Sequence, residues 1–271
     1  MRTQTFHRTF TSVVPLLALF VAMTLMQGRA MAVVTELALW KLGEPGTIVG
    51  GLPQDSVGGH HFQNNFGTQS TVTPGAPLFS STTGNSYTPI AGSYYTAPGT
   101  TVVPTDNFAI ELWARSDNAN QPFADLFTTG ETVGTLRFHT DPSGNWAASL
   151  DNVNWIGGAA GAGQPITVGE WTNLALIRNN GLLTFYINGI AQAGSLGTAP
   201  VIDMARAHLA VTPGGLTSFD GSLDEVRIFS FNPNTDNPVA ALSIFATVPE
   251  PATATLALLG MGVLMRRRRL A

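Results

Sequence analysis

The chain has 271 residues, with 13 lysine and arginine residues against 17 aspartate and glutamate residues, and it contains no cysteine. Nucleic acids and anionic membranes bind basic patches, so this charge balance argues against both as lasting partners. Disulfides are excluded, and the length allows one large domain that can bury an adequate apolar core without them.

The N-terminus has the features of an export signal. A basic start precedes the uncharged apolar stretch Val13–Met26, and Ala30-Met31-Ala32 is an A-x-A cleavage site. We therefore expect residues 1–32 to be a helical signal peptide, with the mature chain starting near Val33 outside the cytoplasm. The alternative, a first transmembrane helix, is disfavoured by the short apolar run and the small-residue site.

The segment 33–247 is predicted to be one domain. It keeps six basic and sixteen acidic residues, a net charge of about −10. This charge is compatible with neutral glycans or divalent cations as ligands.

Strands and turns are predicted throughout this domain, because Gly, Pro, Ser, Thr and Asn recur every few residues and no long helical period occurs. In "FAIELWARS" (108–116), apolar and charged residues alternate as in a half-buried strand. "NNG" (179–181) and Asn188-Gly189 are hairpin signals. Residues 43–107 are interpreted as short strands with long loops of the same domain, and a separate disordered segment is the alternative. The predicted strands are Glu36–Leu42, Phe108–Ser116, Ala124–Thr128, Thr135–Thr140, Trp146–Leu150, Trp171–Arg178, Leu182–Ile187, Ala207–Val211 and Ser222–Phe231.

Consecutive hairpins of this kind predict an all-β fold, a sandwich or jelly roll. The segments "ELALWKLGEPGT", "QDSVGGHHF", "EWTNLALIRNNGLLTFYINGI" and "FDGSLDEVRIFSF" resemble the laminin-G-like, concanavalin A-like domains. The resemblance implies a two-sheet antiparallel β-sandwich. This fold carries lectins, glycan-binding modules, adhesion domains and glycoside hydrolases alike, so it does not decide the function.

Motifs for catalysis are missing from the sequence. Glycosidases on this sandwich place two carboxylates at alternate positions of one strand in a Glu-x-Asp-x-x-Glu pattern, whereas Asp224 and Glu225 are adjacent. There is also no G-x-S-x-G elbow, no H-E-x-x-H motif and only a single lysine, Lys41. We therefore expect a protein that is not an enzyme.

A ligand platform is predicted at "DNVNW", residues 151–155. A sugar ring stacks its C–H face on an exposed aromatic ring while neighbouring carboxylate and amide groups bond its hydroxyls. Trp155 is the expected platform, with Asp151 and Asn154 as hydroxyl partners and Trp146 as a second aromatic. The alternative is that these aromatics close the end of the sandwich.

A structural calcium ion is implied by the family resemblance. In related sandwiches the acidic residue of the closing "DxVR" strand binds Ca²⁺ together with backbone carbonyls, and that residue here is Asp224. Glu44 and Asp55 are expected as further ligands, because Ca²⁺ prefers hard oxygen donors. The alternative is that Asp224 accepts backbone N–H groups or pairs with Arg227.

The C-terminus combines Pro249-Glu250-Pro251, the apolar run Ala252–Met265 and four arginines, Arg266, Arg267, Arg268 and Arg269. Fourteen helical residues would rise only about 21 Å, which makes a marginal anchor. This order resembles the PEP-CTERM sorting signal of Gram-negative bacteria, whose processing enzyme is an exosortase, a membrane transpeptidase. The resemblance implies transient inner-membrane anchoring by residues 248–271, with the arginines in the cytoplasm, and then transfer to the cell surface or extracellular matrix. A permanent anchor is the alternative.

Two functions remain open from the sequence. One is a non-catalytic carbohydrate-binding or adhesion module that associates with exopolysaccharide. The other is a structural protein of the extracellular matrix without a specific small ligand.

Overall fold

The computed structural model describes residues 34–43, 46, 48–49, 52–66, 69–72, 86–89, 94–96, 106–130, 134–151, 153–158, 163–197, 206–210 and 219–245. The predicted signal peptide, the sorting segment with its apolar helix, and Glu44 lie outside these residues. Within the described ranges, no helix is long and apolar enough to cross a membrane.

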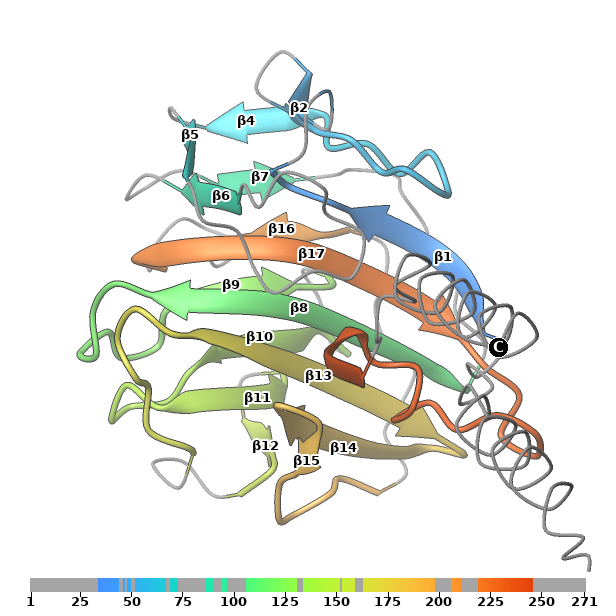
Figure 1. Cartoon of the computed structure of the whole chain (residues 1–271). Coiled ribbons are helices and arrows are strands. Elements are labelled where there is room, and N and C mark those ends of the chain that lie inside the picture. The colour runs from blue at the N-terminus through green and yellow to red at the C-terminus, as the bar shows by residue number, and fades with distance from the viewer. Residues whose placement is uncertain are drawn as a thin grey trace, which may run out of the picture.

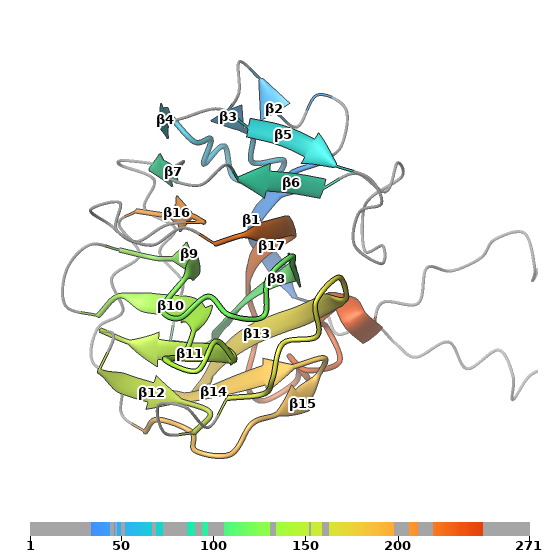
Figure 2. The same cartoon turned by 90° about the vertical axis from the view of Figure 1, so that its left-hand side faces the viewer.

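The described chain folds as two antiparallel β-sheets packed face to face, which confirms the predicted sandwich (Figures 1 and 2). Sheet I has the order β15-β14-β13-β8-β17-β6-β5, and β1 also pairs with β17. Its strands are β1 (Thr35–Trp40), β5 (Gln69–Val72), β6 (Ser86–Pro89), β8 (Phe108–Ser116), β13 (Trp171–Asn179), β14 (Leu182–Ile187), β15 (Ile190–Ala191) and β17 (Gly221–Ser230).

Sheet II has the order β12-β11-β10-β9-β16-β7-β4. Its strands are β4 (Asn64–Phe66), β7 (Tyr94–Thr96), β9 (Asp125–Thr128), β10 (Leu136–Thr140), β11 (Trp146–Leu150), β12 (Asn154–Ile156) and β16 (His208–Leu209). A separate short pair joins β2 (Ile48–Val49) to β3 (Leu52–Pro53). Strands β4 to β7 therefore extend both sheets, so this stretch belongs to the sandwich and is not a linker between domains.

The core lies between the sheets and contains a chain of aromatic contacts. The ring of Trp40 packs edge-on against Phe62 at 5.5 Å and lies 6.3 Å from Phe127. Phe138 continues the chain, 6.4 Å from Phe127 and 6.3 Å from Phe185. These five side chains are at most 2% exposed, so burial of their apolar area supplies a large part of the stability of the sandwich.

Two hairpins form where the sequence predicts them. Asn180 and Gly181 connect β13 to β14 with φ of 50° and 80°, and Asn188 and Gly189 connect β14 to β15 with φ of 50° and 74°. A two-residue turn of type I′ requires positive φ at both positions, which Asn and Gly adopt at low cost.

The closing strand β17 contains a bulge that the sequence pattern does not reveal. Asp224 pairs with Trp113 of β8 and Arg227 pairs with Glu111, so β17 has one residue more than β8 between these pairs. Glu225 takes φ of 46° within this bulge. The extra residue places Asp224 and Arg227 on the same outer face of sheet I, while Leu223 and Val226 both remain in the core.

Candidate functional site: the outer face of sheet II

Trp155 lies on the edge strand β12 and on the outer face of sheet II. Its neighbour Ile156 is buried in the core, and side chains alternate along a strand, so the indole points away from the core. The Trp155 ring is half-buried and packs over the imidazole of His139, with ring centroids 5.1 Å apart and planes 31° from parallel. The indole of Trp155 is therefore partly open to solvent and packed on His139, and its role as a ligand platform stays a prediction.

A row of polar side chains continues from Trp155 across the strands of sheet II. Trp155 pairs with Ser149 of β11, Ser149 pairs with Arg137 of β10, and Arg137 pairs with Thr128 of β9. Paired residues share a face, so these four side chains form one line across the outer face. His139 lies beside this line on β10, two residues from Arg137. We call these five residues the polar face.

Four buried polar atoms of the polar face have no hydrogen-bond partner among the described residues. They are Ser149 Oγ, Arg137 Nε, Thr128 Oγ1 and His139 Nε2. A buried polar group without a partner costs about 1–3 kcal/mol, and native proteins contain few of them. Thr128 and Ser149 are 0% exposed and His139 is 1% exposed, so these atoms are covered and do not open onto solvent.

The polar face carries little net charge. Burial, together with the charge of Arg137, lowers the pKa of His139 to about 4, and the charge of Asp141 only partly opposes this, so the imidazole is neutral at pH 7. The guanidinium of Arg137 is paired with Asp125, Nη1 to Oδ2 at 3.3 Å. Its side chain is 17% exposed, so the rim of the polar face reaches solvent there as well as at Trp155.

Asp151 and Asn154, the predicted hydroxyl partners, have different environments. Asp151 adopts φ of 57°, and its Oδ1 accepts hydrogen bonds from the backbone N–H groups of Gly134 (2.6 Å) and Thr135 (3.0 Å). Asp151 therefore holds the start of β10 in place through Oδ1. Asn154 is exposed next to Trp155 and is the more accessible partner.

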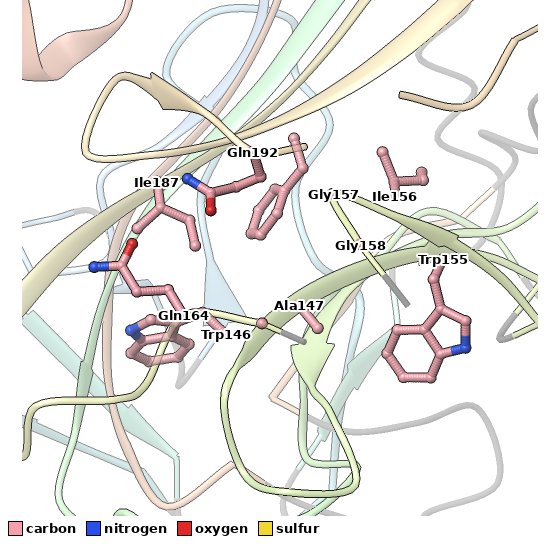
Figure 3. Close-up of a pocket in the computed structure, with 11 residues that line it drawn as sticks. Trp146, Ala147, Trp155, Ile156, Gly157, Gly158, Gln164, Ile187 and Gln192 are labelled. Atoms are coloured by element: carbon pink, nitrogen blue, oxygen red, sulfur yellow. The ribbon is translucent and has the colours of Figure 1, made fainter. Parts of the chain in front are cut away.

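Trp146 differs from the exposed aromatic that the sequence predicts. Its side chain is 2% exposed and belongs to the core, with its ring 6.0 Å from that of Phe219. Figure 3 shows Trp146 beside Gln164 and Ile187, whereas Trp155 points away on the far side of the strands. The alternation of β11 turns Trp146 inward, so the two indoles do not form one platform.

Trp146 instead closes a shallow depression between the edges of the two sheets. The depression is lined by Trp146, Ile187, Gln164 and Gln192, and Trp155 lies at its border (Figure 3). Its empty volume of about 230 Å³ includes space continuous with open solvent, so it is a surface hollow and not an enclosed cavity. It can receive one side of a ligand bound at Trp155 but cannot enclose one.

Of the three predicted calcium ligands, the structure describes Asp224 and Asp55, whereas Glu44 lies outside the described residues. Asp224 is fully buried, and its Oδ1 accepts a hydrogen bond from the N–H of Glu225 in the bulge. Asp55 is surrounded by donors: Leu39, Val57, Gly58 and His60 each donate a backbone N–H at 2.9 Å, and His60 Nδ1 lies 2.9 Å from Oδ2. Its carboxylate is therefore used to order the loop that follows β3.

Burial alone would raise the pKa of Asp55, but the hydrogen bonds from Leu39, His60 and Val57 outweigh it, so the pKa lies below its usual value. The described residues contain no group of three or more His, Asp or Glu side chains that could hold a metal ion. A calcium site at Asp224 stays a prediction.

The buried carboxylates of the described residues all have interaction partners. Asp141 accepts four hydrogen bonds from Ser143, Asn145 and Gly163, and Glu111 is bound by Arg227 and Ser243. Asp125, Asp224 and Glu225 are engaged as well. Each of these buried carboxylates therefore takes part in holding the described structure together.

The fold is an antiparallel β-sandwich of the concanavalin A-like kind, and comparison of the sequence with known families agrees. The chain belongs to the concanavalin A-like lectin/glucanases superfamily, whose laminin-G-type family matches residues 90–236. The PEP-CTERM protein-sorting motif matches residues 247–269, in agreement with the predicted sorting signal, and processing by an exosortase follows from that motif. The predicted motif residues Pro249–Pro251 and Arg266–Arg269, and the cleavage residues Ala30 and Ala32, lie outside the described structure.

Solved structures share the fold at low sequence identity. Domain 4 of AbnA, an extracellular GH43 arabinanase from Geobacillus stearothermophilus solved in complex with arabinotriose, has a TM-score of 0.55 and 20% identity. The match covers 76% of this chain and 98% of that domain. A sialidase from Trypanosoma rangeli has a TM-score of 0.50 and 12% identity, and the match covers 87% of this chain but only 39% of the sialidase. No curated protein matches the sequence.

Proposed function

We propose that this protein is an exported, non-catalytic module that binds a neutral saccharide at the polar face, with Trp155 as the stacking platform. The observation that carries the proposal is the partly open indole of Trp155, backed by His139, with the solvent-accessible polar side chains of Asn154 and Arg137 beside it. Sugars offer both features that such a surface requires, an apolar ring face and closely spaced hydroxyls that donate and accept.

The charge of the polar face favours neutral sugars over anionic ones. Arg137 is compensated by Asp125, and His139 is neutral above pH 4, so no free positive charge is available for a uronate or sulfate. The net charge of about −10 on residues 33–247 also repels anionic polymers. The arabinotriose bound to Domain 4 of AbnA, a neutral oligosaccharide on the same fold, is compatible with this ligand class.

The sorting signal indicates where in the cell the protein would meet a saccharide. The PEP-CTERM motif directs export and membrane-associated sorting in Gram-negative bacteria, and we propose that the processed protein reaches the cell surface or matrix and associates with exopolysaccharide there. The engaged carboxylates support binding without hydrolysis. Affinity should be weak, in the range of about 10 μM to 1 mM, because a shallow site buries little area.

Titration calorimetry with arabinotriose, and with exopolysaccharide extracted from the native cell, tests this function. Trp155→Ala should weaken binding at least tenfold, and Arg137→Met should weaken it to a smaller extent. Trp171→Ala and Arg115→Met are matched controls on sheet I and should bind like wild type. Equal binding by wild type and Trp155→Ala would contradict the assignment of the site. No binding of either ligand by wild type would favour a structural matrix protein.

A further inference from the structure

A loop at one end of the sandwich carries a phenylalanine in a strained backbone conformation. Residues 117–123, here called the rim loop, lie between β8 of sheet I and β9 of sheet II, so the loop crosses from one sheet to the other (Figure 1). Phe123 adopts φ of 58° and is the only aromatic residue with positive φ within the described ranges. A bulky residue costs free energy in this left-handed region, because its Cβ crowds the backbone.

The side chain of Phe123 is also exposed to solvent. It is 43% exposed, more than any other phenylalanine whose exposure the structure describes. Burial of an apolar ring is favourable, so Phe123 lacks much of the stabilisation that the buried rings of Phe127 and Phe138 provide. Phe123 therefore lowers the stability of the fold in two ways, through its backbone conformation and through its exposure.

Gln121 ties the rim loop to sheet I. Its side chain is buried, and Nε2 donates to Ser116 Oγ and lies 3.0 Å from the carbonyl oxygens of Asn118 and Asp220. Its Oε1 accepts the backbone N–H of Asp220 at 2.7 Å. Asp220 directly precedes β17, so these hydrogen bonds fix the loop against the start of the closing strand.

Sheet II holds the rim loop from the other side. The backbone N–H of Phe123 donates to the carbonyl of Asp141, which follows β10. Gly144, in the turn between β10 and β11, lies so close to the loop that an added Cβ would be 2.7 Å from the carbonyl oxygen of Ala119. A strained residue persists only where its surroundings determine its conformation, and such residues are concentrated at ligand-binding sites.

The rim loop presents neutral polar groups next to the phenyl ring. Asn118 and Asn120 are exposed, and the Oδ1 of Asn118 accepts the backbone N–H of Asn120 at 2.9 Å. The carboxylate of the loop, Asp117, is paired with Arg115 at 3.6 Å. Amide groups donate and accept hydrogen bonds as sugar hydroxyls do, and an aromatic ring stacks on the C–H face of a sugar. Because the loop is already ordered, binding there costs little conformational entropy.

We propose that the rim loop is a second saccharide site, with Phe123 as the stacking ring and the amides of Asn118 and Asn120 as hydroxyl partners. This inference rests on the proposed function and adds to it a second contact with the same polymer. Strand β12, which carries Trp155, and β9, which follows the rim loop, are three strand spacings apart in sheet II, about 14 Å. The two sites are therefore separate. A phenyl ring offers less stacking area than an indole, so the rim loop is the weaker site.

Two weak sites on one chain favour long saccharides over short ones. When a polymer is bound at Trp155, its binding at the rim loop is intramolecular, so the second contact strengthens the complex even when its own affinity is low. A short oligosaccharide such as arabinotriose gains much less. The protein can also join two polymer chains, one at each site.

Phe123→Asn tests the rim loop, because it removes the ring and Asn adopts positive φ readily. Its melting temperature should not fall below that of wild type. In calorimetry its affinity for arabinotriose, which is determined by the Trp155 site, should stay that of wild type. Its affinity for exopolysaccharide extracted from the native cell should fall by about threefold or more, because the second contact is lost. Phe123→Tyr keeps the ring and should bind the polymer like wild type. Leu182→Ala, which removes an exposed apolar side chain of β14, is the matched control and should do the same.

NMR of Trp155→Ala with the same exopolysaccharide gives a second readout. The side-chain amide signals of Asn118 and Asn120 should still shift when the Trp155 platform is absent, and unchanged signals would overturn the rim site. Wild-type polymer affinity in Phe123→Asn, or a lower melting temperature of this variant, would overturn it as well and leave the Trp155 site intact. Equal binding by wild type and Trp155→Ala, with loss in Phe123→Asn, would contradict the Trp155 site and keep the rim site. A wild-type chain that binds no saccharide would contradict both.

Discussion

His139 is the residue whose protonation the fold changes most clearly. Its pKa falls from about 6.5 to about 4 because the imidazole is buried and faces the positive charge of Arg137. The negative charge of Asp141 raises the pKa, but by less. The unfolded chain therefore binds a proton at a higher pH than the folded chain. Stability should fall as the pH is lowered from 6.5 to 4, by up to about 3 kcal/mol.

Urea unfolding at pH 7.5, 5.5 and 4.5 measures this effect. His139→Gln should lose less stability over this interval than wild type, because Gln does not titrate. His61→Gln, at an exposed position, is the control and should follow wild type. A decline of equal size in wild type and His139→Gln would show that the imidazole is not the responsible group.

Asp55 makes a separate contribution at lower pH. Burial alone would raise the pKa of Asp55. The hydrogen bonds from the backbone N–H groups of Leu39, His60 and Val57 together lower it by more, so the folded-state pKa lies below its usual value. The stabilisation is present above pH 3.8, the value in the unfolded chain, and is lost as the pH falls through the folded-state pKa. Asp55→Ala should cost roughly 2–4 kcal/mol at pH 7, because several donors lose their acceptor. If the free energy of unfolding of Asp55→Ala at pH 7, measured by denaturant, differs from that of wild type by less than about 1 kcal/mol, this role is refuted.

At the scale of elements, the bulge in β17 explains why the closing strand was predicted only in part. The sequence predicts a strand at Ser222–Phe231, and the structure has one at Gly221–Ser230. In a regular strand the adjacent residues Asp224 and Glu225 would point to opposite faces. The positive φ of Glu225 alters that alternation, and no feature of the local sequence signals it, since Glu is not a residue that favours positive φ.

Calcium binding near this bulge can be tested by thermal unfolding in EDTA and in millimolar CaCl₂. If Asp224 and Glu44 hold the ion, the melting temperature should rise by several degrees with calcium, since a ligand at a hundredfold excess over Kd adds about 2.7 kcal/mol. Asp224→Asn should remove most of this rise. Asp55→Asn should keep it, because Asp55 is engaged by backbone N–H groups. Identical melts of wild type in both buffers would exclude the site.

At the scale of the whole molecule, the sequence predicts the sandwich well and the site in part. Hairpin turns such as Asn188-Gly189 and alternating strands such as 108–116 depend on local chemistry, so they are visible in the sequence. Trp155 was singled out through its polar neighbours, and its role stays a prediction. Ser149, Arg137 and Thr128 were missed because they come from separate strands, and only the register of sheet II brings them together. Trp146 was misplaced because its polar sequence neighbours hide an inward-facing strand position.

The most direct test of saccharide binding at the polar face is NMR of the indole and arginine side chains. The chain has five tryptophans, so five indole N–H signals can be followed during titration with arabinotriose or with the native exopolysaccharide. We predict that the signals of Trp155 Nε1–H and Arg137 Nε–H shift and saturate together, while those of Trp40, Trp113 and Trp171, which belong to sheet I, stay in place. Saturable binding that shifts other signals but leaves Trp155 and Arg137 unchanged, or no shift at any ligand concentration, would contradict the claim.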